Sequence, residues 1–139
     1  MDYNFCVTSL ESDPQSKTAT SVLGLLIAST TNAASNTISV RGIAQKIFND
    51  GKTSPAVKAA LQDCIKFYGD AIDSLNEALT AVKSHDYSSA NVQLSAAFDV
   101  PSNCEDGFKE GKQAKSPITN ENNVLTQRIL IPLAFSNMV

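Results

Sequence analysis

The sequence has no tryptophan, and aromatic residues make up only 6% of its 139 residues. Hydrophobic residues account for 42%, so the interior must be built from alanine, valine, leucine and isoleucine. Such small and aliphatic side chains suit closely packed helices. The length is enough for one hydrophobic core and short for two, so we expect a single domain over residues 1–139.

Runs of basic and of apolar residues are also missing. Fourteen acidic against eleven basic residues give a formal net charge of -3, and no lysine or arginine run follows a phosphate backbone, which argues against nucleic-acid binding. The apolar stretch 22–28 is far shorter than the ~20 residues that cross a bilayer, so no membrane association is expected. The first residues lack the pattern of a secretory signal, which a secreted chain would have lost before this numbering begins.

Groups that carry chemistry are scarce. The single histidine, His85, lies in the polar stretch 83–86 and is expected to be an ordinary surface residue. No Cys-x-x-Cys or His-x-x-x-His spacing occurs, so the sequence predicts neither a metal nor a cofactor. Asp70 and Asp73 form a carboxylate pair, which solvation of a helix surface explains more simply than catalysis. We therefore expect no enzyme.

Apolar residues recur at helical spacing in four long segments. The clearest runs from Ser54 to Ser84, where Ser54 can cap a helix and Pro55 can occupy its first turn. Its seven-residue repeat consists of Leu61, Tyr68, Leu75 and Val82. A second helix is predicted from about Ser16 to Asn49.

The other two predicted helices contain internal prolines. Tyr87 to Phe108 forms a third apolar stripe that Pro101 interrupts with an expected kink or break. A fourth helix, from Asn120 to Met138, contains Pro132 and should be kinked as well. Its apolar stripe is Val124, Leu125, Ile129, Leu133 and Phe135. Four helices with short connections predict an all-α, up-down-up-down antiparallel bundle.

The three cysteines, Cys6, Cys64 and Cys104, fit either scattered cytosolic thiols or one bridge with a leftover. Cys64 lies ~31 Å along its helix from the turn near His85, and Cys104 ~28 Å along the next. Antiparallel neighbours would place the two side by side. We therefore expect a Cys64–Cys104 disulfide, which would stabilise the fold by ~3–4 kcal/mol.

A bundle can also enclose a small ligand if small residues leave its interior underfilled. The many alanines permit this reading, although alanine on a helix seam more often marks close helix approach. A small-ligand carrier is therefore the alternative class of function.

Three stretches resemble a known family. They are Phe5 to Leu10 with Ser12-Asp13-Pro14, then Leu61 to Cys64 with Tyr68 and Asp70-Ala71, and then Asp86-Tyr87 through Cys104 to Phe108. Together they resemble the plant invertase and pectin methylesterase inhibitors, including the plane-tree pollen allergens of that family. The resemblance extends over most of the chain and is closest over residues 61–108.

The resemblance implies a four-helix bundle preceded by an α-hairpin with its own disulfide. Cys6 matches the later cysteine of that hairpin, and its partner would precede Met1. We therefore expect residues 1–14 to be the remnant of a truncated hairpin, residues 15–139 to form the bundle, and Cys6 to be an unpaired thiol.

The family docks one-to-one over the active-site cleft of a plant cell-wall enzyme, which implies a secreted, apoplastic inhibitor. Some invertase inhibitors carry Pro-Lys-Phe where this chain reads Tyr87-Ser88-Ser89, which favours pectin methylesterase over acid invertase as the target. A pollen allergen without retained inhibition is a further alternative. Partner-binding candidates are Asp86, Tyr87, Ser88 and Ser89, where the competing reading is a helix cap at Asp86.

Overall fold

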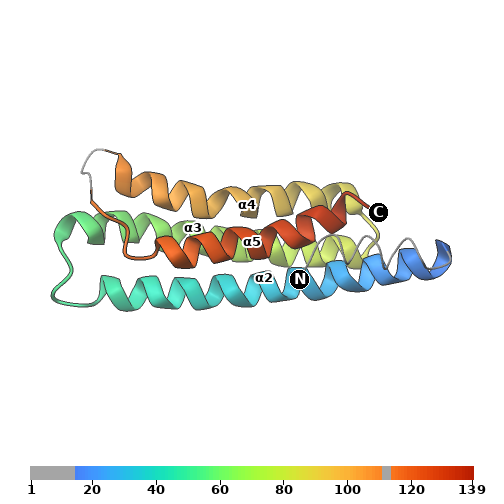
Figure 1. The fold of residues 1–139 in the computed structure, drawn as a ribbon, viewed down its shortest axis with the longest axis horizontal. Coiled ribbons are helices and arrows are strands. Elements are labelled where there is room, and N and C mark those ends of the chain that lie inside the picture. Colours follow the sequence, from blue (N-terminus) through green and yellow to red (C-terminus); the bar gives the residue numbers. More distant parts are fainter. Residues whose placement is uncertain (1–14, 111–113) are drawn as a thin grey trace.

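The structure, a computed structural model, describes residues 15–110 and 114–139, with side chains from residue 21 onward. The expectations for residues 1–14 and for Cys6 lie outside the described residues. The described chain forms α2 (Gln15–Phe48), α3 (Pro55–Lys83), α4 (Tyr87–Lys109) and α5 (Thr119–Ser136). These bounds agree with the predicted ones to within two residues at most ends. Figure 1 shows the four helices running alongside one another.

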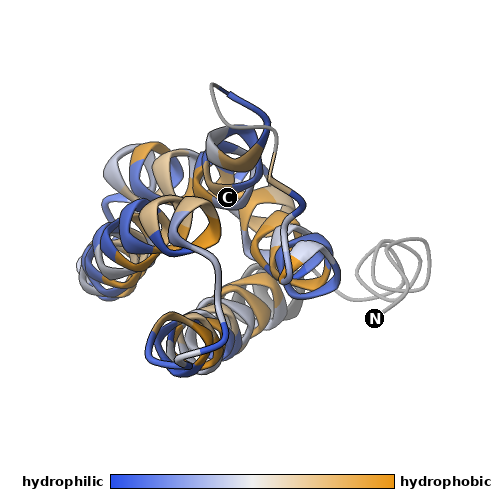
Figure 2. Ribbon diagram, turned by 90° about the vertical axis from the view of Figure 1, so that its left-hand side faces the viewer, coloured by the Kyte–Doolittle hydropathy of each residue, from blue (hydrophilic) through white to orange (hydrophobic). Residues whose placement is uncertain are grey.

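The helices form a closed ring in which α2 packs against α3 and α5, and α4 packs against the same two helices. Each helix runs antiparallel to the one that follows it in the chain (Figure 1). Figure 2, which views the bundle from one end, shows hydrophobic segments on the sides of the helices that face one another. The predicted all-α, up-down-up-down bundle is therefore confirmed.

Local sequence explains how α3 begins. The Ser54 side chain accepts a hydrogen bond from the Val57 amide at 3.3 Å, and Pro55 occupies the first helical position. Proline is tolerated there because that amide would have no partner within the helix. The helix therefore starts where the sequence predicts.

Threonines in the middle of α2 have low helix propensity, yet two of them lie in the core. Thr30 and Thr37 are fully buried, and each hydroxyl donates to a carbonyl one turn earlier, at 2.6 Å and 2.8 Å respectively. Because these bonds satisfy the hydroxyls inside the helix, burial leaves no polar group unpaired. Packing against α3 and α5 then stabilises the segment.

The core consists of one inward-facing stripe from each helix. Its large, fully buried side chains include Leu26, Leu61, Tyr68, Leu75, Leu94, Leu125 and Ile129. The prediction for Val124 is wrong, because this side chain is 45% exposed in the groove between α2 and α5. Asn122 takes an inward position of α5 instead and is buried.

The prolines do not interrupt their helices. Pro101 lies inside α4 and Pro132 inside α5, and both helices are continuous through them, so the local break expected at Pro101 is absent. Both prolines are buried. Burial of the ring against the core offsets part of the cost of the lost amide hydrogen bond.

No helix in residues 15–110 or 114–139 combines the length and apolar character needed to cross a bilayer.

Candidate functional site

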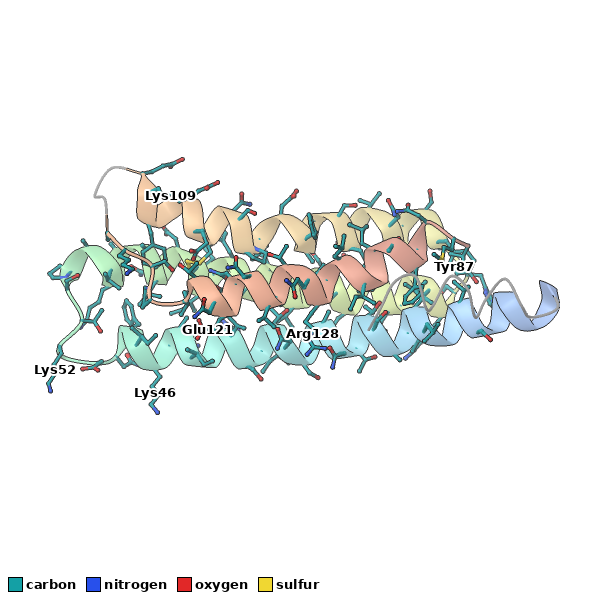
Figure 3. All side chains as sticks on the ribbon, viewed as in Figure 1. Lys46, Lys52, Tyr87, Lys109, Glu121 and Arg128 are labelled. Atoms are coloured by element: carbon teal, nitrogen blue, oxygen red, sulfur yellow. A yellow bond between two sulfur atoms is a disulfide. The ribbon has the colours of Figure 1, made fainter. Side chains whose placement is uncertain are left out.

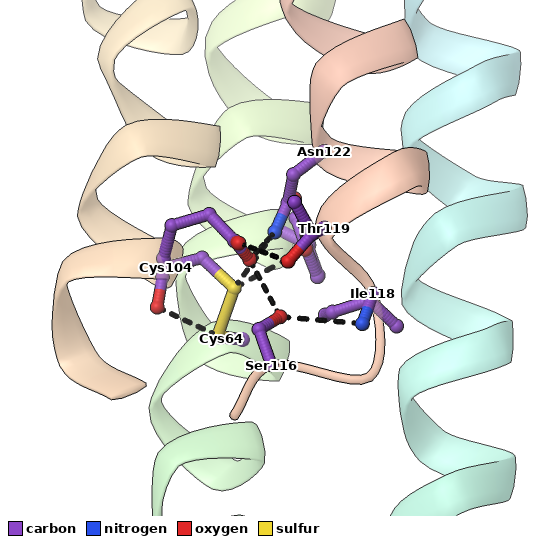
Figure 4. Close-up of a disulfide and its surroundings, with 8 residues drawn as sticks. Cys64, Cys104, Ser116, Ile118, Thr119 and Asn122 are labelled. Carbon is purple, nitrogen blue, oxygen red and sulfur yellow. Dashed lines mark hydrogen bonds between the residues drawn. A yellow bond between two sulfur atoms is a disulfide. The ribbon is translucent and has the colours of Figure 1, made fainter. Parts of the chain in front are cut away.

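A disulfide joins α3 to α4 near one end of the bundle. Cys64 and Cys104 lie with Cα atoms 4.9 Å apart, and both side chains are buried (Figure 4). The expected bond is therefore present, between two antiparallel helices and 40 residues apart in the chain.

A polar network surrounds this disulfide, and it was missed from the sequence. The Tyr68 hydroxyl of α3 donates to Oδ1 of Asn122 in α5. Nδ2 of Asn122 donates to Glu105 Oε2 in α4 at 2.7 Å and lies 3.3 Å from the Cys104 Sγ (Figure 4). Burial raises the pKa of Tyr68 well above its ordinary value, so the phenol stays protonated as a donor. Three helices therefore meet in one set of side-chain hydrogen bonds.

The Glu105 carboxylate holds the start of α5. Ser116 Oγ donates to its Oε2 at 2.7 Å and Thr119 Oγ1 to its Oε1 at 2.6 Å. Ile118, the residue before the helix, provides no side-chain cap. A negative charge from α4 therefore faces the positive end of the α5 helix dipole in place of a local cap. Because its hydrogen bonds join α3, α4 and the start of α5, this network is suited to holding the helices together.

The candidate partner-binding residues lie at the opposite end, where the turn after α3 leads into the first turn of α4. Figure 3 shows Tyr87 at the end of the bundle remote from Lys109. The structure brings Asp86, Tyr87, Ser88 and Ser89 together as the start of α4, with Asp86, Ser88 and Ser89 exposed and Tyr87 half-buried against the core.

Asp86 acts as a cap in this turn. Its Oδ1 accepts from the Ser89 amide at 3.2 Å, and its Oδ2 accepts from the Ser89 hydroxyl at 2.7 Å. These hydrogen bonds hold the pKa of the Asp86 carboxyl below its ordinary value. The bond from the Ser89 hydroxyl has the larger effect, and the bond from the Ser89 amide the smaller one. Capping explains Asp86 and Ser89, while the exposed Ser88 takes no part in these hydrogen bonds.

His85 has a more specific setting than the expected ordinary surface residue. Its backbone has φ 58°, in the left-handed region, and its ring Nδ1 lies 2.9 Å from the Tyr87 hydroxyl. The side chain is exposed, as expected, and lies within hydrogen-bond distance of the Tyr87 side chain. A positive φ at a non-glycine residue is uncommon enough to draw attention to this turn.

Other kinds of site find no support in the described part of the chain. Residues 15–110 and 114–139 contain no group of three or more His, Cys, Asp or Glu side chains arranged to hold a metal ion. Hollows of about 240 to 390 Å³ lie in the grooves between neighbouring helices, and the buried apolar side chains of the four helices form one cluster in the bundle.

Comparison with known proteins decides the family. The model of the family described as "Plant invertase/pectin methylesterase inhibitor" matches residues 1–135 of this chain. The chain belongs to this family. Because it is a family of enzyme inhibitors, the expectation of an inhibitor rather than an enzyme is confirmed.

Individual members of the inhibitor family are similar to this chain over most of its length. "Pectinesterase inhibitor 12" of Arabidopsis thaliana is 51% identical over 124 residues, covering 89% of this chain and 70% of its own. "Putative invertase inhibitor" of Platanus acerifolia is 42% identical over 139 residues, covering 100% and 76%. The crystal structure of a mutant form of an Arabidopsis pectin methylesterase inhibitor matches with a TM-score of 0.76 and 27% identity, over 85% of this chain and 78% of that one.

Proposed function

We propose that this protein inhibits a pectin methylesterase by docking one-to-one over the enzyme's active-site cleft. The observation that carries this proposal is the 51% identity to "Pectinesterase inhibitor 12", which extends over 89% of the chain. The rigid bundle supports it, because a partner surface held by four packed helices and a disulfide loses little conformational entropy on binding.

We place the turn Asp86 to Ser89 at the centre of the contact. The cap at Asp86 fixes the start of α4, and Tyr87 supplies an amphipathic aromatic side chain of the kind enriched at binding hot spots. A specific interface buries about 800 Å² on each partner, so exposed residues of the adjoining helices contribute as well.

The direct test mixes the purified protein with a plant pectin methylesterase and measures ester hydrolysis. We expect activity to fall linearly with added protein and to vanish near one equivalent, with a one-to-one complex on size-exclusion chromatography. Full activity at micromolar protein would reject the proposal.

Acid invertase is the second candidate target, favoured by the Platanus relative that matches the whole chain at 42% identity. The same titration with invertase distinguishes the two, because the true target loses activity at near-stoichiometric protein while the other enzyme keeps it. A protein that inhibits neither enzyme would fit the alternative of a family member without retained inhibition.

We propose that the protein acts outside the cell, in the plant cell wall. The Cys64–Cys104 disulfide supports this location, because such bonds persist in oxidising compartments and are rare in the cytosol. The small-ligand carrier is the weaker candidate, since the family is one of enzyme inhibitors and the described helices share one cluster of buried apolar side chains.

A further inference from the structure

A hollow of about 390 Å³ lies in the groove between α2 and α3, at the end of the bundle where α2 leads into α3. Phe48 and Ile65 form its apolar part, and both side chains are half-buried against the core. Its other lining side chains are the exposed carboxamides of Gln45, Asn49 and Gln62. An apolar surface with a few polar groups, in a volume of ~300–1,000 Å³, is typical of ligand sites.

Two basic side chains flank this hollow. The Arg41 guanidinium lies against α3 at Gly69, one turn beyond Ile65, where a Cβ atom would be 3.5 Å from Nη2. Its Nε is buried and has no hydrogen-bond partner among the described residues, and α2 contains no acidic residue that could pair with it along the helix. Lys58 Nζ lies 6.0 Å from the centre of the Phe48 ring, at the edge of the hollow. The protein thus satisfies the guanidinium only in part, so a ligand that supplies a carboxylate gains a charged hydrogen bond.

The hollow lies in the positively charged part of the molecule. Residues 41–69 contain five basic and two acidic side chains, a net charge of +3. Residues 70–110 contain two basic and eight acidic side chains, a net charge of -6. Figure 3 shows Lys46 and Lys52 at the positive end of the bundle. A negatively charged ligand is therefore attracted to this end, although the whole chain has a net charge of -3.

We propose that this groove binds a uronate oligosaccharide, a carbohydrate whose sugar rings carry carboxylates. The carboxylates pair with Arg41 and Lys58, and the apolar face of a sugar ring packs against Phe48 and Ile65. The ring hydroxyls exchange hydrogen bonds with the three carboxamides of the hollow. A uronate fits this lining better than an acidic protein segment, because each carboxamide offers both a donor and an acceptor to neighbouring hydroxyls of a ring.

The groove is remote from the turn that we propose as the centre of the enzyme contact. From Gln62 to Ser84 the separation along α3 is ~30 Å, so the oligosaccharide and the enzyme can be bound at the same time. Resting on the proposed function, the ligand has the chemistry of the enzyme's product, because a pectin methylesterase hydrolyses uronate methyl esters to carboxylates. The groove would then retain the inhibitor where the enzyme has already acted.

The test titrates the free protein with hexagalacturonate and follows binding by NMR at about pH 6, where the carboxylates are ionised. We expect the resonances that shift to cluster in the groove, with the side-chain amides of Gln45, Asn49 and Gln62 among them. Fully methyl-esterified hexagalacturonate has the same rings without the charges and should bind about tenfold more weakly. Equal binding of the two would overturn the assigned role of the basic side chains.

Substitutions locate the site. Arg41→Gln should weaken hexagalacturonate binding about tenfold, as suits the loss of one charged hydrogen bond, and Lys58→Gln should weaken it in the same direction. Arg128→Gln is the matched control, because it removes an exposed arginine of α5 outside the groove and should bind as the wild type does. Equal weakening by Arg41→Gln and Arg128→Gln would overturn the site, as would an absence of shifts at millimolar hexagalacturonate.

Hexaglutamate tests the other source of carboxylates. We expect it to bind more weakly than hexagalacturonate, because it lacks the ring hydroxyls. Equal or tighter binding would assign the groove to an acidic protein segment and overturn the proposal. The enzyme is absent from all of these measurements, so a failure of the proposed inhibition would leave their outcome unchanged.

Discussion

Asn122 occupies a position in α5 where an apolar side chain would ordinarily face the core. Its amide is used at both ends, as an acceptor for Tyr68 and as a donor to Glu105, so burial leaves neither end unpaired. The amide also lies against the Cys104 sulfur. One polar residue thus connects the three helices that surround the disulfide.

Replacing Asn122 by alanine should lower the free energy of unfolding by about 2 kcal/mol, because it leaves the buried Tyr68 hydroxyl without its acceptor. Urea denaturation measures the change. Asn123→Ala is the matched control, since this neighbouring side chain is exposed and should change stability by less than about 0.5 kcal/mol. Equal effects of the two substitutions would contradict the assigned role of the network.

Asp86 makes a pH-dependent contribution to stability. Its pKa is lower in the folded protein than in the unfolded chain, so the contribution is present above the unfolded pKa and is lost as the pH falls through the folded one. Asp86→Asn keeps a capping side chain but does not titrate. We therefore expect the melting temperatures of wild type and variant to converge on acidification.

The Ser89→Ala background is the control for this experiment, because it removes the hydroxyl whose hydrogen bond is the largest cause of the lowered Asp86 pKa. In that background, the difference in melting temperature between the proteins with aspartate and with asparagine at position 86 should depend less on pH. A difference that stays constant down to pH 2 in the wild-type background would rule out the capping explanation.

At the scale of helices, the disulfide fixes the pairing of α3 with α4. Replacing Cys64 and Cys104 together by alanine should lower the free energy of unfolding by about 4 kcal/mol, as expected for a loop of this size. The comparison is made by urea denaturation in a Cys6→Ala background, so that the third cysteine of the sequence cannot exchange with the bridge. A loss of less than about 1 kcal/mol would show that packing alone holds the two helices.

The helices and their order were predictable because the evidence for them is periodic and local. The seven-residue repeat of Leu61, Tyr68, Leu75 and Val82 identifies a core face, and all four side chains are fully buried. The cap at Ser54 is equally local.

What could not be predicted depends on contacts between helices. Val124 has a suitable residue type, but it lies on the groove side of α5 next to α2 and stays exposed. The network of Glu105 and Asn122 requires two helix ends to meet beside the disulfide, which no spacing within one helix reveals. The setting of His85 likewise follows from its backbone conformation, which the residue type alone does not fix.

For the molecule as a whole, stability comes from a core shared by all four helices. Leu75 is fully buried near the middle of α3, so Leu75→Ala should lower the free energy of unfolding by about 3 kcal/mol through lost burial and a cavity. Val92→Ala, at a position 64% exposed on α4, should stay within about 0.5 kcal/mol. Calorimetry checks the shared core, because helices that unfolded independently would give separate transitions, and that result would contradict it.

The disulfide and its network lie about 30 Å along α3 from the turn that holds His85 to Ser89. Mutations in that turn therefore leave the disulfide and its network untouched and affect stability only through the cap of α4. The same separation makes the segment 84–89 a natural place to graft foreign recognition loops.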